Sequence, residues 1–268
     1  MKVLEPIWNA KPETANRVRG RIEAILDYAK ARGWRSGENP ARWRGHLANL
    51  LPPSSKVARV QHHAALPWRQ ISSFMATLGQ QHGVAALALR FAILTVARTG
   101  EVLGARWDEI DMEAGLWTIP ARRMKAGREH RVPLSSGALA ALREASGLRV
   151  QSRPDAFVFP GANSDRPLSS MAMLMLLRRM DRDDLTAHGF RSTFRDWCAE
   201  DTDYPGELAE MALAHTLRDK TEAAYRRGDL LPKRRRLMDD WSDFCGTGKD
   251  ITRDAPQDHA NRGDGESG

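Results

Sequence analysis

The chain has 268 residues, of which 41% are apolar and 28% charged, and it carries a formal net charge of +7. This length suffices for one large domain with an appended module. The longest apolar run, GVAALALRFAILTVA, contains Arg90 and is too short to span a bilayer, and no secretory leader opens the chain. Cys198 and Cys245 match no zinc-binding spacing, so the sequence predicts a cytoplasmic protein with reduced thiols.

The positive charge comes overwhelmingly from arginine, and the sequence pI is about 9.8. Such a balance favours a polyanionic partner, most simply nucleic acid, because neutralised phosphates release their counterions. On charge alone, the alternative interpretation is a basic protein that binds no polyanion.

The first predicted element is an amphipathic helix over residues 13–32. Its apolar groups recur at three- and four-residue spacing, as at Val18, Ile22 and Ile25, and arginines lie on the opposite face. A second, shorter helix is expected to start after Pro40. We therefore predict a partial helical module over residues 1–51, followed by a linker over residues 52–65 that is marked by adjacent prolines and serines.

The main domain is predicted over residues 66–245. Two packed helices are expected in PWRQISSFMATLGQ and HGVAALALRFAILTVA, and a short helix in RTGEVLGARW. The stretch GLWTIPARRMKAGREHRVPLS is predicted to be a β-hairpin with a turn at Ala126-Gly127. Further helices are expected at about 136–146, 169–180, 189–200, 205–214, 218–227 and 232–244. The predicted fold is mainly α with a small antiparallel β-sheet (α+β), ending in a disordered tail over residues 246–268 that lacks apolar clusters.

The stretch LTAHGFRSTFRDW could bind a phosphate. Thr186 is a plausible N-cap, and His188 and Arg191 share one face at the helix start, where free N–H groups attract an anion. An HxxR pair is common by chance, however, and an ordinary surface pair explains it equally well.

Two other basic residues lie in unusual places. Arg98 follows a fully apolar helix, and Glu101 is close enough to brace its guanidinium, either as a structural ion pair or as part of an anion clamp. Lys125, near the hairpin tip, is the only lysine between Lys56 and Lys220. An ammonium can release its proton where an arginine cannot, so Lys125 is a candidate general acid, although a solvated turn lysine is the plainer interpretation.

His215 and Tyr225 complete the candidate set. His215 ends an apolar helix, where it could simply cap carbonyl groups. Tyr225 is one of only three tyrosines and stands among Lys220, Arg226 and Arg227. It could be a packed surface side chain or a nucleophile held against a phosphate.

The order R…K…HxxR…H…Y resembles that of the tyrosine recombinases. The boxes ARTGEVLGARWDEID, WTIPARRMKAGREHRVPLS, HGFRSTFRDW and LAHTLRDKTEAAYRRGDLLPKRRRLMDDWSDF are similar to those of prophage and genomic-island integrases. The resemblance covers residues 1–244 and implies a catalytic domain over 66–245 preceded by a partial core-binding module. Relative to that branch, the chain lacks the N-terminal arm-binding domain and part of the core-binding domain.

The resemblance also implies roles for the candidate residues. Arg98 and Arg191 would clamp the phosphate, with Glu101 supporting, and Lys125 would be the hairpin lysine. His188 and His215 would be the active-site histidines, and Tyr225 the nucleophile that forms a 3′-phosphotyrosyl link. No metal or other cofactor is expected. The basic side chains expected to contact DNA are Arg17, Arg19, Arg21, Arg42, Arg44, Arg123 and Arg128.

The implied partner is double-stranded attachment-site DNA in the bacterial nucleoid, bound by a homotetramer whose free subunit could be a monomer, with no membrane involved. The implied activity is integration or excision of a mobile element. Two alternatives stay open: a truncated, catalytically impaired remnant that only binds DNA, and a relaxing enzyme of the type IB topoisomerase kind, which shares the chemistry.

Overall fold

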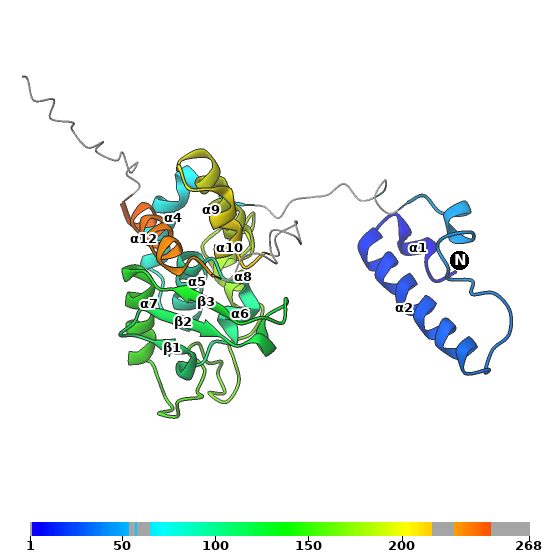
Figure 1. Ribbon diagram of the computed structural model, residues 1–268, viewed down its shortest axis with the longest axis horizontal. Helices are drawn as coiled ribbons and strands as arrows, with labels where there is room; N and C mark the ends of the chain where they lie inside the picture. Colours follow the sequence, from blue (N-terminus) through cyan, green and yellow to red (C-terminus); the bar gives the residue numbers. More distant parts are fainter. Residues whose placement is uncertain (1, 54–56, 58–64, 216–227, 248–268) are drawn as a thin grey trace, which may run out of the picture. The chain divides into compact units, whose positions relative to one another are not determined.

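The computed structural model describes residues 2–53, 57, 65–215 and 228–247. The chain divides into two compact units, Met1–His62 and His63–Gly268, which are described separately (Figure 1). The predicted helix at 218–227, the predicted tail beyond residue 247 and most of the predicted linker lie outside the described residues.

The N-terminal unit contains α1 (Glu5–Trp8), α2 (Pro12–Ala31) and the 3₁₀-helix η1 (Leu47–Asn49). Helix α2 confirms the amphipathic helix predicted at 13–32. A small core forms around Trp8, whose ring stacks on Trp43 at 5.6 Å and whose indole N–H donates to the carbonyl of Pro52 at 2.9 Å. Only the first part of the apolar face of α2 is covered, because Ile25 and Tyr28 are 65% and 58% exposed.

The prediction of a second helix after Pro40 is wrong. Residues 40–46 lie mostly in turns, and between them and residue 53 the only helical turn is η1. Gly45 has φ +76°, a left-handed conformation that ends a right-handed helix. The side chain of Asn39 also competes for the backbone: it accepts from the N–H of Ala41 at 2.9 Å and donates to the carbonyl of Glu23 at 2.8 Å.

The C-terminal unit confirms the predicted mainly helical class with a small antiparallel sheet. Its described elements, in chain order, are η2 (Trp68–Gln70), α4 (Ile71–Gly79), α5 (Val84–Thr95), α6 (Thr99–Leu103), η3 (Trp107–Glu109), β1 (Ile110–Asp111), β2 (Leu116–Ile119), η4 (Ala121–Arg123), β3 (His130–Pro133), α7 (Ser136–Gly147), α8 (Ala172–Arg179), α9 (Gly189–Glu200), α10 (Gly206–Ala212) and α12 (Leu231–Thr247). The helices predicted at 136–146, 169–180, 189–200, 205–214 and 232–244 correspond to α7, α8, α9, α10 and α12 within a few residues.

The sheet has the order β1-β2-β3, with both pairs antiparallel. Strands β2 and β3 form the predicted hairpin, in which Trp117 pairs with Val132 and Ile119 with His130. Strand β1 was not predicted, because two residues are too few to show an alternating pattern. The turn that contains Lys125, the predicted general acid, lies between β2 and β3.

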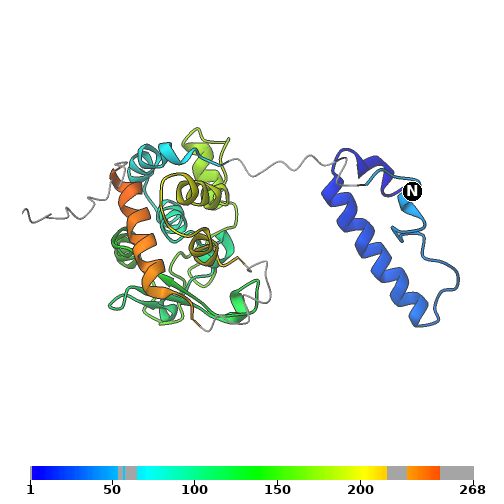
Figure 2. The same ribbon diagram turned by 45° about the horizontal axis from the view of Figure 1, so that its top comes forward.

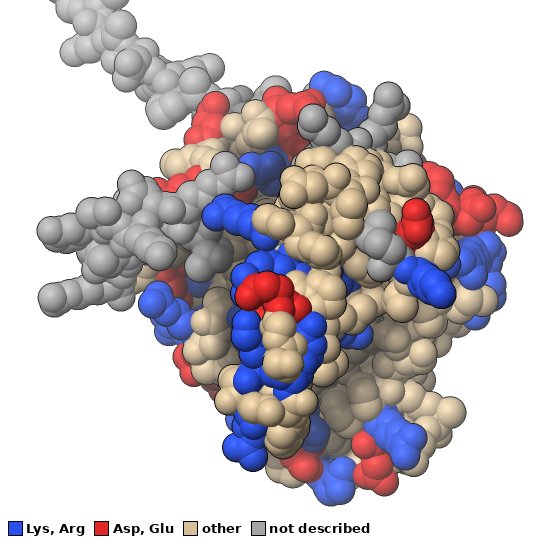
Figure 3. Space-filling view, turned by 90° about the vertical axis from the view of Figure 1, so that its right-hand side faces the viewer, with Lys and Arg blue, Asp and Glu red and all other residues tan. Residues whose placement is uncertain are grey.

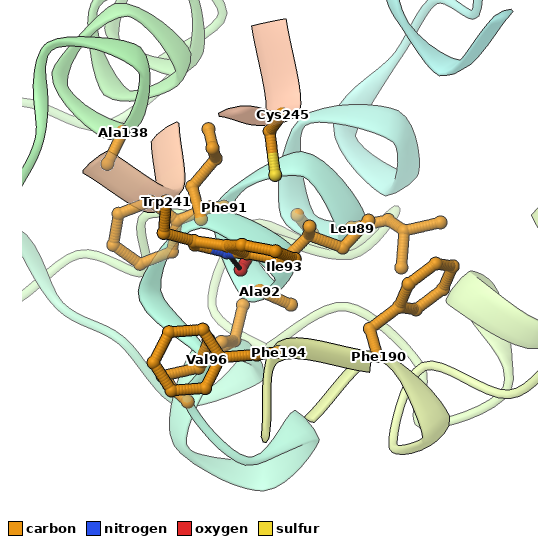
Figure 4. Packing of buried hydrophobic residues seen from close by; sticks show 14 of the residues in the cluster. Leu89, Phe91, Ala92, Ile93, Val96, Ala138, Phe190, Phe194, Trp241 and Cys245 are labelled. Atoms are coloured by element: carbon orange, nitrogen blue, oxygen red, sulfur yellow. Dashed lines mark hydrogen bonds between the residues drawn. The ribbon is translucent and has the colours of Figure 1, made fainter. Parts of the chain in front are cut away.

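The core of this unit surrounds α5, which is buried on nearly all sides. Helix α12, orange in Figure 2, packs against α4, α5 and α7. Its Trp241 lies across α5 in Figure 4 and donates its indole N–H to the carbonyl of Ile93 at 2.9 Å. Cys198 and Cys245 are both buried and free, and burial raises the pKa of the Cys198 thiol to about 12. In the portion of the chain that can be described, no helix is both long and apolar enough to cross a bilayer.

Candidate active site

The site begins where α5 ends. Val96, the residue after the helix, is buried and has φ +49°. A left-handed conformation is unfavourable for a β-branched residue by about 1–3 kcal/mol, so the surrounding contacts must hold it in place. The carbonyl of Val96 accepts a hydrogen bond from Nη1 of Arg191, which belongs to α9. The strained turn therefore directs a backbone acceptor at a predicted site arginine.

Arg98 lies two residues further on, at the N-cap of α6. Its Nη1 donates to Oε1 of Glu101 at 2.8 Å, and its backbone N–H donates to Oε2 of the same carboxylate, also at 2.8 Å. Its Nη2 donates to the carbonyl of Ala214 at 2.9 Å. Glu101 is only 5% exposed, so this charge-assisted bracing takes place largely out of water. The predicted contact between Arg98 and Glu101 is present.

Arg191 is almost fully buried. Its Nη2 donates to the carbonyl of Leu213 at 2.6 Å and lies 3.1 Å from Nε2 of His215. Burial, together with the nearby charge of Arg98, lowers the pKa of Arg191 to about 10, so the guanidinium stays protonated at neutral pH. The two arginines come from positions more than ninety residues apart, and each feels the charge of the other. A positive pair held this way suits an oxyanion.

Three consecutive residues at the C-terminal end of α10, beginning with its last residue Ala212, bind three different side chains through their backbone. His130 of β3 is hydrogen-bonded to the backbone of Ala212, Arg191 donates to Leu213, and Arg98 donates to Ala214. Carbonyls at the end of a helix have no partner within the helix, and here side chains from three other segments satisfy them. The C-terminal end of α10 is therefore where the site is assembled.

His215 follows these carbonyls directly and is 40% exposed. Its Nδ1 lies 2.7 Å from Oε2 of Glu210, and Oε1 of Glu210 accepts from Nε of Arg195 at 2.7 Å. Burial alone would raise the pKa of Glu210, but the hydrogen bonds from His215 and Arg195 hold it below its usual range. If Nδ1 carries the proton toward this carboxylate, Nε2 is left as an acceptor facing Arg191.

His188 is the N-cap residue of α9, one helical turn before Arg191, and it is exposed. The N-cap is thus His188 and not Thr186 as predicted, although the hydroxyl of Thr186 accepts from the N–H of Gly189 at 3.0 Å. His188 and Arg191 thus lie on the same turn of one helix, with the arginine buried and the histidine at the surface.

Lys125 lies apart from the buried groups, in the turn between η4 and β3. Residues 125–129 are all exposed, and Gly127 provides the left-handed conformation of the turn with φ +64°. Tyr225, the predicted nucleophile, lies outside the described residues. The structure therefore brings together Arg98, Arg191 and His215, and places Lys125 on a separate loop.

The arginines predicted to contact DNA differ in their surroundings. Arg21, Arg44 and Arg128 are exposed, as are Arg17 and Arg42, which pair with glutamates on the surface. Arg19 is mostly covered and bonds Glu23 and the carbonyl of Ala41. Arg123 bonds Glu109 and the carbonyl of Glu101, so its charge is already engaged within the protein. In the view of Figure 3, Lys and Arg groups near the middle surround a group of carboxylates.

Sequence reasoning missed two residues that contact the site, His130 and Glu210, and a third, Arg234, whose charge acts on His130. His130 and Arg234 stand in charged stretches of the sequence, EHRV and KRRR, with nothing to mark His130 as half-buried or Arg234 as buried. Only the spacing of Glu210 and His215, five apart around a helix end, could have suggested their contact.

The mainly helical fold, its three-stranded sheet and the two converging arginines define the class of tyrosine-type site-specific recombinases. The chain belongs to the phage integrase family, whose profile matches residues 65–229. The profile of the phage integrase central domain matches residues 1–46.

Known proteins similar to the chain support this assignment. Prophage integrase IntZ of Escherichia coli (strain K12) is 34% identical over 245 residues, which cover 91% of this chain and 58% of that relative. The chain therefore spans less than two thirds of its relative. Crystal structures of a lambda integrase(75-356) dimer bound to a COC′ core site and of a lambda integrase tetramer bound to a Holliday junction share the fold. Their TM-scores are both 0.56, at 19% and 16% identity, covering 85% and 81% of this chain and 78% and 63% of those chains.

Proposed function

We propose that the chain is a site-specific DNA recombinase that promotes integration or excision of a mobile element by metal-free transesterification. One observation carries the proposal: Arg98 and Arg191 converge on the carbonyls of Ala214 and Leu213, next to His215. Both guanidinium groups are held by neutral carbonyls, and in the contacts described only Arg98 also pairs with a carboxylate, that of Glu101, so the cluster keeps positive charge for an anion.

The chemistry of a phosphodiester explains the need for these groups. Its negative charge repels nucleophiles, and its leaving alkoxide is poor. Two arginines that hold the non-bridging oxygens offset the charge gained in the pentavalent transition state. Because Arg98 and Arg191 are held in place before DNA arrives, little reorganisation is needed when that charge develops.

The remaining roles follow the sequence order. The phenol oxygen of Tyr225 attacks phosphorus, with His188 as the candidate base for its proton, since the phenol has an unperturbed pKa of about 10. The bond from phosphorus to the 5′-oxygen breaks, and Lys125 supplies a proton to that oxygen. In its protonated form, His215 hydrogen-bonds a non-bridging oxygen through Nε2 while Nδ1 stays bonded to Glu210. The phosphotyrosyl link keeps the bond energy, so a second DNA end can reverse the step without ATP.

Double-stranded attachment-site DNA in the cytoplasm is the proposed substrate, and a homotetramer on DNA is the proposed assembly. Among proteins of the same fold, lambda integrase is found as a dimer on a core site and as a tetramer on a Holliday junction. The exposed basic side chains of this chain, such as Arg21, Arg44 and Arg128, fit a phosphate backbone.

Trapping the covalent link tests the proposal. A pool of random-sequence duplexes that contain a nick releases a short fragment on cleavage, so the phosphotyrosyl product accumulates. The protein should form an adduct that survives SDS, and Tyr225→Phe should form none. Adduct formation by Tyr225→Phe would contradict the assigned nucleophile. If SDS dissociates every protein–DNA complex, the chain is a remnant that only binds DNA. Plasmid relaxation without site preference would identify a topoisomerase-like enzyme.

A further inference from the structure

A buried arginine lies at the start of α12. Arg234 is 1% exposed, and its guanidinium makes contacts only beyond its own helix among those described. Nη1 donates to the carbonyl of Arg131 at 2.7 Å, and Nε donates to the carbonyl of Asp229 at 2.7 Å. Nη2 lies 3.2 Å from Oδ2 of Asp229. One side chain thus joins strand β3 to the residues just before α12.

Asp229 completes this group of three residues, which we name the exit node: Arg131, Asp229 and Arg234. Oδ2 of Asp229 accepts from Nε of Arg131 at 2.8 Å and lies 2.8 Å from its Nη2. Oδ1 accepts from the N–H of Leu231 at 3.2 Å. The next residue, Leu230, has φ +50°, a strained conformation that these bonds hold. Burial alone would raise the pKa of Asp229, but Arg131 and Arg234 keep it below its usual range.

Strand β3 contacts the chain on both sides of the stretch that contains Tyr225. On the entry side, His130 is hydrogen-bonded to the backbone of Ala212, three residues before His215. On the exit side, the neighbouring Arg131 binds Asp229. The same strand follows directly on the turn of Lys125. Two adjacent strand residues thus fix the chain before residue 216 and after residue 227.

Stability alone does not explain an arginine at position 234. Moving a guanidinium out of water costs several kcal/mol, and buried ion pairs can often be replaced by apolar residues of similar volume without loss of stability. Leu237, Met238 and Trp241 on the same helix show that α12 fills its core with apolar groups elsewhere. A buried, directional donor is instead suited to fixing one geometry.

We propose that the exit node is a positioning device for the tyrosine. It anchors the chain after residue 227 to β3 and so sets where Tyr225 can stand relative to Arg98 and Arg191. This inference rests on the proposed function. The node itself does not touch the reacting phosphate, and its three residues act through the backbone that leads to Tyr225.

The first test measures adduct formation in a single turnover with the nicked duplexes at saturating protein. Asp229→Asn keeps an acceptor for Leu231 but loses the charge, Arg234→Met keeps volume, and Arg131→Met removes only a partly exposed donor. Each should slow the reaction by about tenfold to a hundredfold, since a small misplacement of a reacting group has effects of this size. DNA affinity should not change. The matched controls Asp243→Asn and Arg236→Met, both exposed on α12, should react like the parent.

The second test removes the tyrosine from the reaction. In a Tyr225→Phe background, hydrogen peroxide can serve as the nucleophile: its oxygen bonds to phosphorus, the bond to the 5′-oxygen breaks, and that oxygen takes a proton. A positioning role predicts that Asp229→Asn leaves this peroxide-dependent cleavage unchanged, whereas Arg191→Lys slows it. A merely structural role would slow both reactions together.

The outcomes separate the two proposals. A parent protein that forms no adduct overturns the proposed function and this inference with it. A parent that forms the adduct at the same rate as all three node variants overturns the inference alone. The inference also fails if the node variants lose peroxide-dependent and tyrosine-dependent cleavage equally. Arg131→Met keeps the test valid if Arg234→Met does not fold, because its side chain is 43% exposed.

Discussion

The arginine pair and the lysine turn of the proposed site are built in opposite ways. Arg98 and Arg191 are fixed by carbonyls of Ala214, Leu213 and Val96, and the pair is largely shielded from water. Lys125 stands in a run of exposed residues with a glycine at the turn. The protein itself already orients the two arginines, whereas Lys125 is positioned only by the hairpin turn that carries it.

This difference separates two tasks of a phosphoryl-transfer site. Binding the charge of a phosphate gains most from donors that are already oriented, because they need not reorganise. Delivering a proton to the leaving oxygen needs a group that can approach and withdraw. We therefore expect substitutions in the arginine pair to affect both folding and catalysis, and substitutions in the turn to affect catalysis alone.

The largest effect is expected for Lys125→Ala. Losing a general acid should slow single-turnover cleavage by about 10²–10⁴-fold with no change in the free energy of unfolding, because the side chain is exposed. A substrate with sulfur at the 5′-bridging position should restore the rate, since a thiolate leaves without a proton. Lys233→Ala, an exposed lysine on α12, is the control. Absence of rescue by sulfur would remove the proton-donor role.

Arg191→Lys should slow cleavage by about 10²–10³-fold, and sulfur should not rescue it. Lysine keeps the charge but cannot reach Val96, Leu213 and the phosphate together. The free energy of unfolding should also fall by about 1–3 kcal/mol, because a buried carbonyl loses its donor. Denaturant titration and the cleavage assay measure the two effects, with the exposed Arg178→Lys as control. Full activity in Arg191→Lys would contradict a bidentate clamp.

His130 should make the free energy of unfolding depend on pH. Burial, aided by the nearby charge of Arg234, lowers its pKa from 6.5 to about 4. Between these values the unfolded chain binds more protons than the folded one, so the free energy of unfolding falls as pH decreases through this window. The difference of 2.5 pH units corresponds to roughly 3 kcal/mol once pH is below 4.

The measurement is denaturant unfolding at a series of pH values from neutral to 4. His130→Asn keeps an N–H donor for Ala212 but does not titrate, so its curve should lack this slope, whereas the exposed His82→Asn should follow the parent. Identical slopes in His130→Asn and the parent would show that another group controls the acid sensitivity.

The smallest effect is expected for Glu101→Gln. The amide can still accept from the backbone N–H of Arg98, but the ion pair with its guanidinium is lost. We expect a loss of about 1–2 kcal/mol in unfolding free energy, because Arg98 is partly solvated. Cleavage should slow less than in Arg191→Lys. Glu113→Gln, exposed beside the sheet, serves as control. A larger kinetic loss than that of Arg191→Lys would mean that Glu101 contacts the substrate.

Local pattern was enough to predict most elements. The apolar periodicity of α2, the continuous apolar run of α5 and the alternation of β2 and β3 are short-range features that depend only on the order of neighbouring residues. The helix after Pro40 failed because Gly45 and the Asn39 side chain act on the backbone more strongly than the weak apolar pattern there. The order of the candidate residues, read with the family resemblance, predicted a set of which the structure brings Arg98, Arg191 and His215 together.

The amino-acid sequence alone determined which segments fold into helices and hairpin, and which residue types are available for phosphate chemistry. Only the tertiary structure decided that Arg191 is buried and that Arg123 is engaged with Glu109. It also decided that His130 bonds the backbone of Ala212 and that Arg234 bonds the carbonyl of Arg131. The reason is physical: periodicity depends on neighbours three or four residues apart, whereas the partners of a buried charge come from segments far away in the chain.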